Sequence, residues 1–381
     1  MTFRRTSVRH RIYGAIACGS MVALAACGGS SSTPPEKIDL GSGPPEAGTV
    51  KKDALKGITL SFVSWGGEFQ DGQMKAAFNG FGAESGAKIV SDGPTSNAKI
   101  KAQVESGNVS WDVIDQTAIP ADVGCGTLYQ PLDKDIIDFS HVPEELQFGQ
   151  YGKCGVPSML NGMILIYNTK KYGVNPPKSW VDFFDTKTFP GKRGVYGVTG
   201  DVDPGVLEPA LLADGVPEDQ LYPLDISRAL KKMSSIRKDI VFWKIGSDAQ
   251  QLVEAGEVDM AMMWSGRAGQ TIVKNGAPFA AVWNQWFPIP DVLVVPKGAK
   301  NPKASMAAIN YYLGAKQQAK MSELTSYSGV NKDSDLSAID PKSRAFLPTE
   351  HPDQMVKVDA KWYAKNYDKV VEQYGQWMAG S

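Results

Sequence analysis

The sequence predicts an α/β protein built on mainly parallel sheets, because strand patterns alternate with helix patterns along the chain. Alternating apolar residues predict a strand over residues 58–63, and apolar positions at helical spacing predict a helix that starts at Asp71 and ends at Gly86. After another helix, a buried strand is expected over residues 111–115. Parallel strands need crossover connections of this length. With 381 residues, the chain is long enough for about two such domains.

Residues 1–26 have the pattern of an export signal. Four arginines and no acidic residue accompany an apolar run that ends in the motif Leu-Ala-Ala-Cys at residues 24–27. This motif resembles the bacterial lipobox, so we expect Cys27 to carry lipid that anchors the protein to a membrane; cleavage and release without lipid is the alternative. Residues 27–50 are small, polar and interrupted by proline, and are therefore expected to form a flexible tether.

The composition is that of a soluble globular protein, with 42% hydrophobic and 21% charged residues. Without the four arginines of the signal, the chain has 41 acidic and 36 basic residues, so its net charge is negative. A negative net charge does not indicate nucleic-acid binding, which is typical of basic proteins. Catalytic residue types are scarce: only His141 and His351 remain after the signal, and the G-x-S-x-G motif is absent. We therefore expect no enzyme, no cofactor and no metal. An exported hydrolase and an adhesive protein are distant alternatives.

Two cysteines are left once Cys18 leaves with the signal and Cys27 takes lipid. Cys125 and Cys154 form an even pair in an exported protein, so we expect them to be joined. Closing a loop of about 30 residues is worth on the order of 3 kcal/mol in the chain-entropy model. Two buried free thiols are the alternative.

The densest set of candidate binding residues lies within residues 258–298. Trp264 and Arg267 follow one predicted strand, Trp286 follows a second, and Asp291 opens a third. In open α/β sheets, ligands lie beyond the carboxyl ends of the strands, where loops and helix N-termini converge. An aromatic wall with a few fixed charges suits a small charged organic ligand, whereas ordinary packing is the alternative for each tryptophan.

Further candidates also stand where predicted strands end. Trp65 and Gly66 follow the first strand, Gln116 follows the strand at 111–115, and Asp201 lies in a later loop. Polar residues at strand ends also commonly cap the next turn, which is the alternative for Gln116. Asp203 is explained without a ligand, as the N-cap of a helix that begins at the proline after it.

Several motifs resemble the spermidine/putrescine family of bacterial ABC-transporter solute-binding proteins. They are W-S-G-R-A at 264–268, V-W-N-Q-W at 282–286, D-V-L-V-V-P-K-G-A-K-N at 291–301 and S-Y-S-G-V-N-K at 326–332. The resemblance covers about residues 56–332. It implies a type II periplasmic-binding-protein fold, in which two lobes, each a mainly parallel sheet flanked by helices, enclose a ligand cleft. The expected parts are lobe 1 over 57–166 and 291–335, lobe 2 over 167–283, a second hinge crossing at 284–290, and a helical segment at 341–381.

The same resemblance implies a function and roles for single residues. The protein is expected to be a monomeric periplasmic receptor that delivers a small amine to the permease of an ABC importer. An aromatic residue after the first strand stacks on the ligand in this family, and Trp65 stands there. Trp264 is expected to stack as well, Asp291 stands at the acidic position that pairs with an ammonium group, and Tyr327 is expected to supply a ring or hydroxyl.

Departures from the family pattern leave the ligand open. Val202 and Gly205 stand opposite two acidic positions of the family, and Ile289 replaces an aromatic residue. Arg267 stands where the polyamine binders have a small polar residue. A guanidinium in the cleft repels a polycation and favours a carboxylate, unless Asp291 neutralises it. We expect a polyamine, with an amino acid such as a γ-amino acid as the alternative.

Overall fold

A computed structural model describes residues 38–147 and 152–380. The expected signal peptide, residues 1–26, and the expected lipidation site, Cys27, lie outside the described residues. The strands are β1 (Thr59–Val63), β2 (Lys88–Asp92), β3 (Val113–Thr117), β4 (Gly155–Asn168), β5 (Arg193–Tyr196), β6 (Ile240–Trp243), β7 (Met260–Trp264) and β8 (Phe279–Val294).

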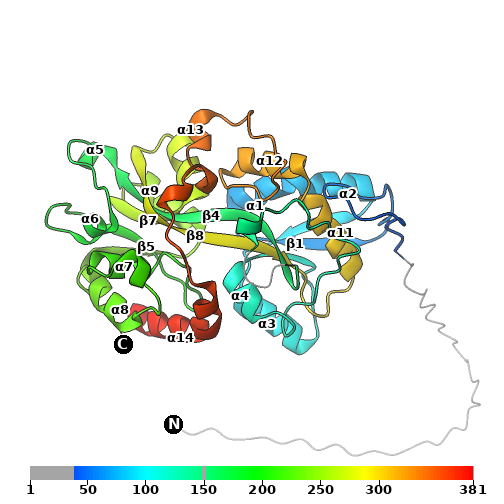
Figure 1. The fold of residues 1–381 in the computed structure, drawn as a ribbon, viewed down its shortest axis with the longest axis horizontal. Coiled ribbons are helices and arrows are strands. Elements are labelled where there is room, and N and C mark those ends of the chain that lie inside the picture. Colours follow the sequence, from blue (N-terminus) through cyan, green and yellow to red (C-terminus); the bar gives the residue numbers. More distant parts are fainter. Residues whose placement is uncertain (1–37, 148–151, 381) are drawn as a thin grey trace, which may run out of the picture. The chain divides into compact units, whose positions relative to one another are not determined.

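The helices flank these strands and are interspersed with them along the chain (Figure 1). They are α1 (Gly67–Gln73), α2 (Asn79–Ser85), α3 (Asn97–Ser106), α4 (Ala118–Val123), α5 (Thr169–Tyr172), α6 (Trp180–Phe184), α7 (Glu208–Ala213), α8 (Ile226–Ser234), α9 (Gly246–Glu254), α10 (Ser265–Gly269), α11 (Pro302–Tyr312), α12 (Ala315–Thr325), α13 (Pro341–Arg344) and α14 (Ala360–Ala379). Single π-helical turns, Met74–Phe78 and Gln270–Lys274, continue α1 and α10. Within the described ranges, no helix is long and apolar enough to cross a membrane.

The strands follow the order β2-β1-β3-β8-β4-β7-β5-β6. At one end β1 pairs in parallel with β2 and β3, and at the other β5 pairs in parallel with β6 and β7. The expected α/β class, with mainly parallel pairing at each end, is confirmed. β4 and β8 lie between the two ends and are antiparallel to each other and to their outer neighbours (Figure 1).

Both central strands are long enough to serve both ends of the sheet. The start of β4 pairs with the end of β8, as Gly155 with Val294, where β8 also pairs with β3. The end of β4 pairs with the start of β8, as Tyr167 with Ala280, where β4 also pairs with β7. We take these strands as the crossings of the proposed hinge. A kink at Gln285, whose φ is 59°, interrupts β8 between its two halves.

Four local expectations differ from the structure. The separate strands expected before Trp286 and from Asp291 are one long strand, β8. The first helix starts at Gly67 rather than Asp71, because the Gln70 side chain accepts a hydrogen bond from the Gly66 N–H and closes the turn earlier. Asp203 caps no helix, since α7 begins later. The described part of the expected tether packs on the body: Ile38 and Leu40 lie against the hydrophobic core, and the Gly48 N–H donates to the Asn310 carbonyl at 2.9 Å.

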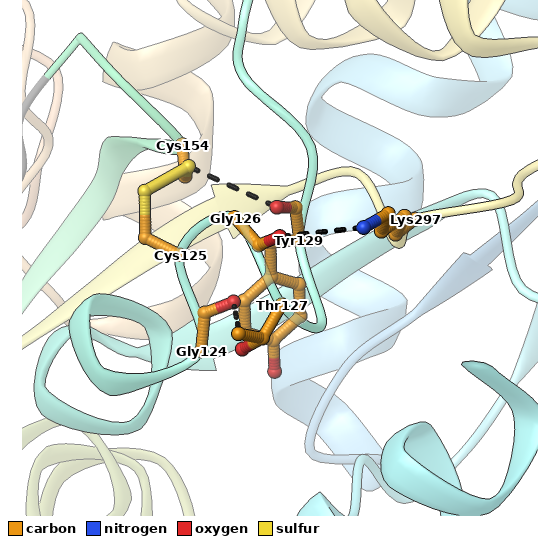
Figure 2. Close-up of a disulfide and its surroundings, with 7 residues drawn as sticks. All are labelled: Gly124, Cys125, Gly126, Thr127, Tyr129, Cys154 and Lys297. Carbon is orange, nitrogen blue, oxygen red and sulfur yellow. Dashed lines mark hydrogen bonds between the residues drawn. A yellow bond between two sulfur atoms is a disulfide. The ribbon is translucent and has the colours of Figure 1, made fainter. Parts of the chain in front are cut away.

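A disulfide joins Cys125, just after α4, to Cys154, just before β4 (Figure 2). Their Cα atoms are 5.5 Å apart. Beside it, the buried Tyr129 and the Lys297 side chain hold the loop at residues 124–129 against the segment that follows β8. The expected pairing of these two cysteines is therefore present, and it fastens the start of the first crossing strand to the loop after α4.

Candidate functional site

A small cavity lies where the ends of several strands meet. Trp65 follows β1, Thr117 ends β3, and Trp264 ends β7. Asp291 in β8 lies between Thr117 on one neighbouring strand and Met159 on the other. The free volume is about 10 Å³, so the walls lie close together. The lining residues are Trp65, Phe69, Thr117, Met159, Asn161, Asp203, Trp264, Arg267, Ile289, Asp291 and Tyr327.

Two tryptophans form an aromatic wall, and each one orients a carboxylate. The ring centroids of Trp65 and Trp264 are 6.0 Å apart, and the rings are inclined by 58°. The Trp65 Nε1–H donates to Asp291 Oδ2 at 2.9 Å, and the Trp264 Nε1–H donates to Asp203 Oδ2 at 3.0 Å. Trp264 is itself fixed by the neighbouring rings of Tyr196 and Trp243. The wall therefore presents aromatic surface and holds two acidic groups in place.

Both lining carboxylates favour a positively charged partner. Burial raises the pKa of Asp291 well above its usual value, and the nearby charge of Asp115 raises it further. Burial also raises the pKa of Asp203, with Asp201 adding to the effect. Ammonium groups placed against such carboxylates compensate the cost of keeping them ionised away from water. These two side chains thus form the acidic part of the cavity.

Asp115 lies behind Asp291 and does not line the cavity. It accepts hydrogen bonds from the Gln73 amide and from Ser158 Oγ, the latter at 3.1 Å. Burial raises the pKa of Asp115 to about 7, although its hydrogen bonds from Gln73 and Ser158 oppose the rise. Since the charge of Asp115 raises the pKa of Asp291, an ammonium group placed beside Asp291 would favour the ionised form of that carboxyl.

Arg267 contributes the positive charge of the cavity. Its side chain is buried; Nη2 donates to the Gly66 carbonyl at 2.9 Å and Nη1 to Gln250 Oε1 at 3.2 Å. Its Nε is buried without a hydrogen-bond partner. Among the described residues, Arg267 makes no ion pair with a carboxylate, and Asp291 bonds to Trp65 instead. Burial raises the pKa of Tyr327, and the adjacent Arg267 guanidinium opposes that rise.

The structure brings five of the predicted site residues together around the cavity, and Gly66 supports the site indirectly. The five are Trp65, Trp264, Arg267, Asp291 and Tyr327. Gly66 offers its carbonyl to Arg267 rather than lining the cavity. Because Gly66 has a φ of 72°, a glycine at this turn avoids the strain that a side chain would bring.

Three predicted site residues lie elsewhere. Gln116 points the other way from its strand neighbours and donates to Asn97 Oδ1 at 2.5 Å. Asp201 is buried behind the cavity, where it accepts from the Tyr196 hydroxyl at 2.8 Å and the Tyr367 hydroxyl at 2.5 Å. Trp286 donates its Nε1–H to the His351 carbonyl at 2.8 Å and lines a different cavity.

Six lining residues were not in the predicted set: Phe69, Thr117, Met159, Asn161, Asp203 and Ile289. Asp203 matters most, since it supplies the second carboxylate. Its neighbour Asp201 was the residue predicted from the adjacent pair of acids, but two tyrosines turn that side chain away. No signal in the sequence separates the two acids, because the choice depends on the C-terminal helix α14, which carries Tyr367.

Comparison with known proteins connects this geometry with solute binding. Residues 73–346 match the family model of the bacterial extracellular solute-binding proteins. A γ-aminobutyric acid-binding protein of Pseudomonas aeruginosa is 30% identical over 84% of this chain and 91% of its own length. A spermidine/putrescine-binding periplasmic protein of Haemophilus influenzae is 25% identical over 86% of this chain and 91% of its own.

A solved structure of a GABA receptor is similar in both fold and sequence. It superposes with a TM-score of 0.75 at 37% identity, covering 84% of this chain and 97% of that one. The matched family and these relatives are binding proteins of ABC transport rather than enzymes, and this chain is accordingly a binding protein with a two-lobed periplasmic-binding-protein fold. The chain belongs to the family of bacterial extracellular solute-binding proteins.

Proposed function

We propose that the protein captures a small amine that also bears a carboxylate, a γ-amino acid such as γ-aminobutyrate, and delivers it to the permease of an ABC importer. The observation that carries this proposal is the buried guanidinium of Arg267, which lines the same cavity as Asp203 and Asp291 and has no carboxylate partner of its own among the described residues. The ligand supplies that partner.

The arrangement of charge favours a zwitterion over a polyamine. The ammonium group lies near Asp203 and Asp291, the carboxylate pairs with Arg267, and the carbon chain lies against Trp65 and Trp264. A polyamine would satisfy the acids but would bring a second positive charge toward Arg267, and like charges in a desolvated site are costly. The similarity to the γ-aminobutyric acid-binding protein and the GABA receptor supports the same choice.

Calorimetric titration with a matched set of ligands tests this proposal. Putrescine and γ-aminobutyrate each contain four carbon atoms and an ammonium group at one end. At the other end putrescine has a second ammonium group and γ-aminobutyrate has a carboxylate. Butylamine and butyrate carry one charge each. We expect γ-aminobutyrate to bind much more tightly than the other three. Tighter binding of putrescine would restore the polyamine expectation, and no binding of any of the four would reject the whole ligand class.

We also propose that the mature protein is periplasmic and held to the membrane by lipid on Cys27, a residue outside the described ranges. The Leu-Ala-Ala-Cys motif at 24–27 supports this proposal. Replacing Cys27 by alanine is expected to move the protein from the membrane fraction to the soluble one, as seen by fractionation and immunoblotting. Equal partitioning of the parent and the variant would argue against the anchor.

A further inference from the structure

A second and larger cavity lies close to the candidate site. Its volume is about 620 Å³, and we call it the proline groove because Pro204, Pro288, Pro290, Pro348 and Pro352 contribute to its walls. Helix α4 and the start of α14 both contribute residues to its walls. Proline has no backbone N–H, and the Trp286 Nε1–H in the wall is already bonded to His351. The groove is therefore mostly apolar, and its polar lining residues are Asp122, Thr349 and Lys357.

A third, narrow cavity shares lining residues with both of the others, and we call it the passage. Its volume is about 20 Å³. Thr117, Asp203 and Ile289 line both the passage and the candidate site. At its other end, Ala118 and Pro204 are among the residues that line both the passage and the proline groove. The passage thus shares lining residues with the candidate site on one side and with the proline groove on the other.

The passage leaves the candidate site at the acidic end. Asp203 belongs to its wall, whereas Arg267 does not. A ligand whose ammonium group lies at Asp203 and whose carboxylate lies at Arg267 therefore has its nitrogen next to the opening. Any group that passes through must be attached at or beside that nitrogen, and it meets apolar walls formed by Ala118, Ile119 and Ile289.

We propose that the protein also binds γ-amino acids whose nitrogen carries an apolar substituent, with the charged head in the candidate site and the substituent running through the passage into the proline groove. This inference rests on the function proposed above. An N-alkyl amine keeps its positive charge, so it still pairs with Asp203 and Asp291. Its alkyl tail gains the free energy of leaving water for a largely apolar cavity.

Titration of the full mature protein with three ligands tests the inference. They are γ-aminobutyrate, its N-hexyl derivative, and a γ-aminobutyrate with a hexyl group on the carbon beside the carboxylate. This third ligand has the same charges and the same hexyl tail, but its tail is attached beside the carboxylate, at the end expected to lie near Arg267. We expect the N-hexyl ligand to bind at least as tightly as γ-aminobutyrate and the carbon-substituted one about tenfold or more weaker.

Two variants test whether the hexyl tail follows this route. Ala118→Leu adds bulk where the passage meets the groove, and Ala360→Leu adds bulk in the groove wall at the start of α14. Neither residue lines the candidate site. In both variants we expect the N-hexyl ligand to lose about tenfold in affinity while γ-aminobutyrate keeps its own, which also shows that the variants fold.

The possible failures can be told apart. If no ligand binds, including γ-aminobutyrate, the proposed function fails. If γ-aminobutyrate binds and the N-hexyl derivative does not, the function stands and the inference is wrong. Equal binding of both hexyl derivatives, or unchanged N-hexyl affinity in both leucine variants, would also overturn the route through the passage.

Discussion

At the scale of single residues, the candidate site is set by a buried guanidinium that has no carboxylate partner among the described residues. The guanidinium of Arg267 is buried and held by two neutral acceptors, Gly66 and Gln250. Burying a charge without a counter-charge costs several kcal/mol, and a ligand carboxylate that arrives there offsets part of that cost. The free energy of binding therefore depends strongly on whether the ligand carries such a group.

The buried acids predict how the stability of the ligand-free protein changes with pH. The pKa of Asp115 is raised to about 7, chiefly by burial, and those of Asp203 and Asp291 are raised in the same direction. For Asp115, the folded state binds more protons than the unfolded state between the unfolded pKa of about 4 and the folded pKa of about 7. The stability that Asp115 contributes is thus fully present below about pH 4 and is lost as the pH rises to about 7, and the raised pKa values of Asp203 and Asp291 change the stability in the same direction.

We expect the melting temperature of the ligand-free protein to fall by several degrees between about pH 5 and pH 8, as measured by differential scanning calorimetry. Asp115→Asn should flatten this dependence, since the amide does not titrate, whereas Asp219→Asn at an exposed position should leave it unchanged. A melting temperature that rises over this range in the parent protein would contradict the assigned direction of the pKa shifts.

The residue scale is also where prediction from sequence was least complete. Trp65, Trp264, Arg267, Asp291 and Tyr327 were predicted because each follows or opens a strand or belongs to a motif. Asp201 was preferred to Asp203 because capping explained the latter, and the structure reverses the two. The reason is a contact across 166 residues of sequence, from Tyr367 to Asp201, which no local pattern reveals.

At the scale of elements, the N-terminus of α9 sets the position of Arg267. A Cβ atom added at Gly246 would lie 2.3 Å from Arg267 Nε, so the absence of a side chain there gives the guanidinium its place. We expect Gly246→Ala to displace Arg267 and to weaken γ-aminobutyrate binding by about tenfold to a hundredfold, measured by calorimetric titration, because hydrogen bonds to a charged group are lost.

Gly375 in α14 provides a matched control. A Cβ atom added there meets no atom within 4 Å. Gly375→Ala should leave binding unchanged and stabilise the helix by about 0.5–1 kcal/mol. Unchanged binding in Gly246→Ala, or an equal loss in both alanine variants, would mean that the position of Arg267 does not govern affinity.

The disulfide is an element-scale restraint on the first crossing strand. Cys125 and Cys154 are separated by 29 residues. Replacing both by alanine should lower the free energy of unfolding by about 3 kcal/mol, because the unfolded chain gains the entropy of an open loop. Urea unfolding of the parent and the double variant measures this difference. Coincident unfolding curves would show that the bond adds no stability.

Local sequence patterns predicted the boundaries of helices and strands more closely than they predicted the residues of the site. The glycine at Gly86 ends α2 in the left-handed conformation, as the sequence predicted, and β4 is one continuous strand up to Asn168. The start of α1 was misplaced because Gln70 reaches back to the Gly66 N–H, a bond that favours an earlier start than the Asp71 cap suggested. Competing caps within one turn cannot be ranked from sequence alone.

At the scale of the whole molecule, the candidate site draws its residues from both ends of the sheet. Trp65 follows β1, whereas Trp264 and Arg267 come from β7 and α10 near the other end. Arg267 reaches across to the Gly66 carbonyl, so the two groups of elements are in direct contact at the cavity. With a free volume of about 10 Å³, the walls must separate to admit a ligand and close on it again.

The fold class could be predicted from sequence, because it depends on periodicity and on motifs. The ligand could not, because it depends on whether Arg267 and Asp291 neutralise each other, and that is decided by distance. In the structure Asp291 accepts a hydrogen bond from Trp65, and Arg267 has no carboxylate partner among the described residues. One side-chain hydrogen bond thus separates the polyamine expectation from the γ-amino acid proposal.

The most direct test of this account is a calorimetric cycle with two ligands, γ-aminobutyrate and putrescine, and two proteins, the parent and Arg267→Gln. Arg228→Gln, at an exposed ion pair with Asp214, serves as the control. We predict that Arg267→Gln lowers γ-aminobutyrate affinity by about a hundredfold and leaves putrescine affinity unchanged or higher. Equal loss of both ligands, or unchanged γ-aminobutyrate binding, would contradict the role of Arg267 as the carboxylate partner.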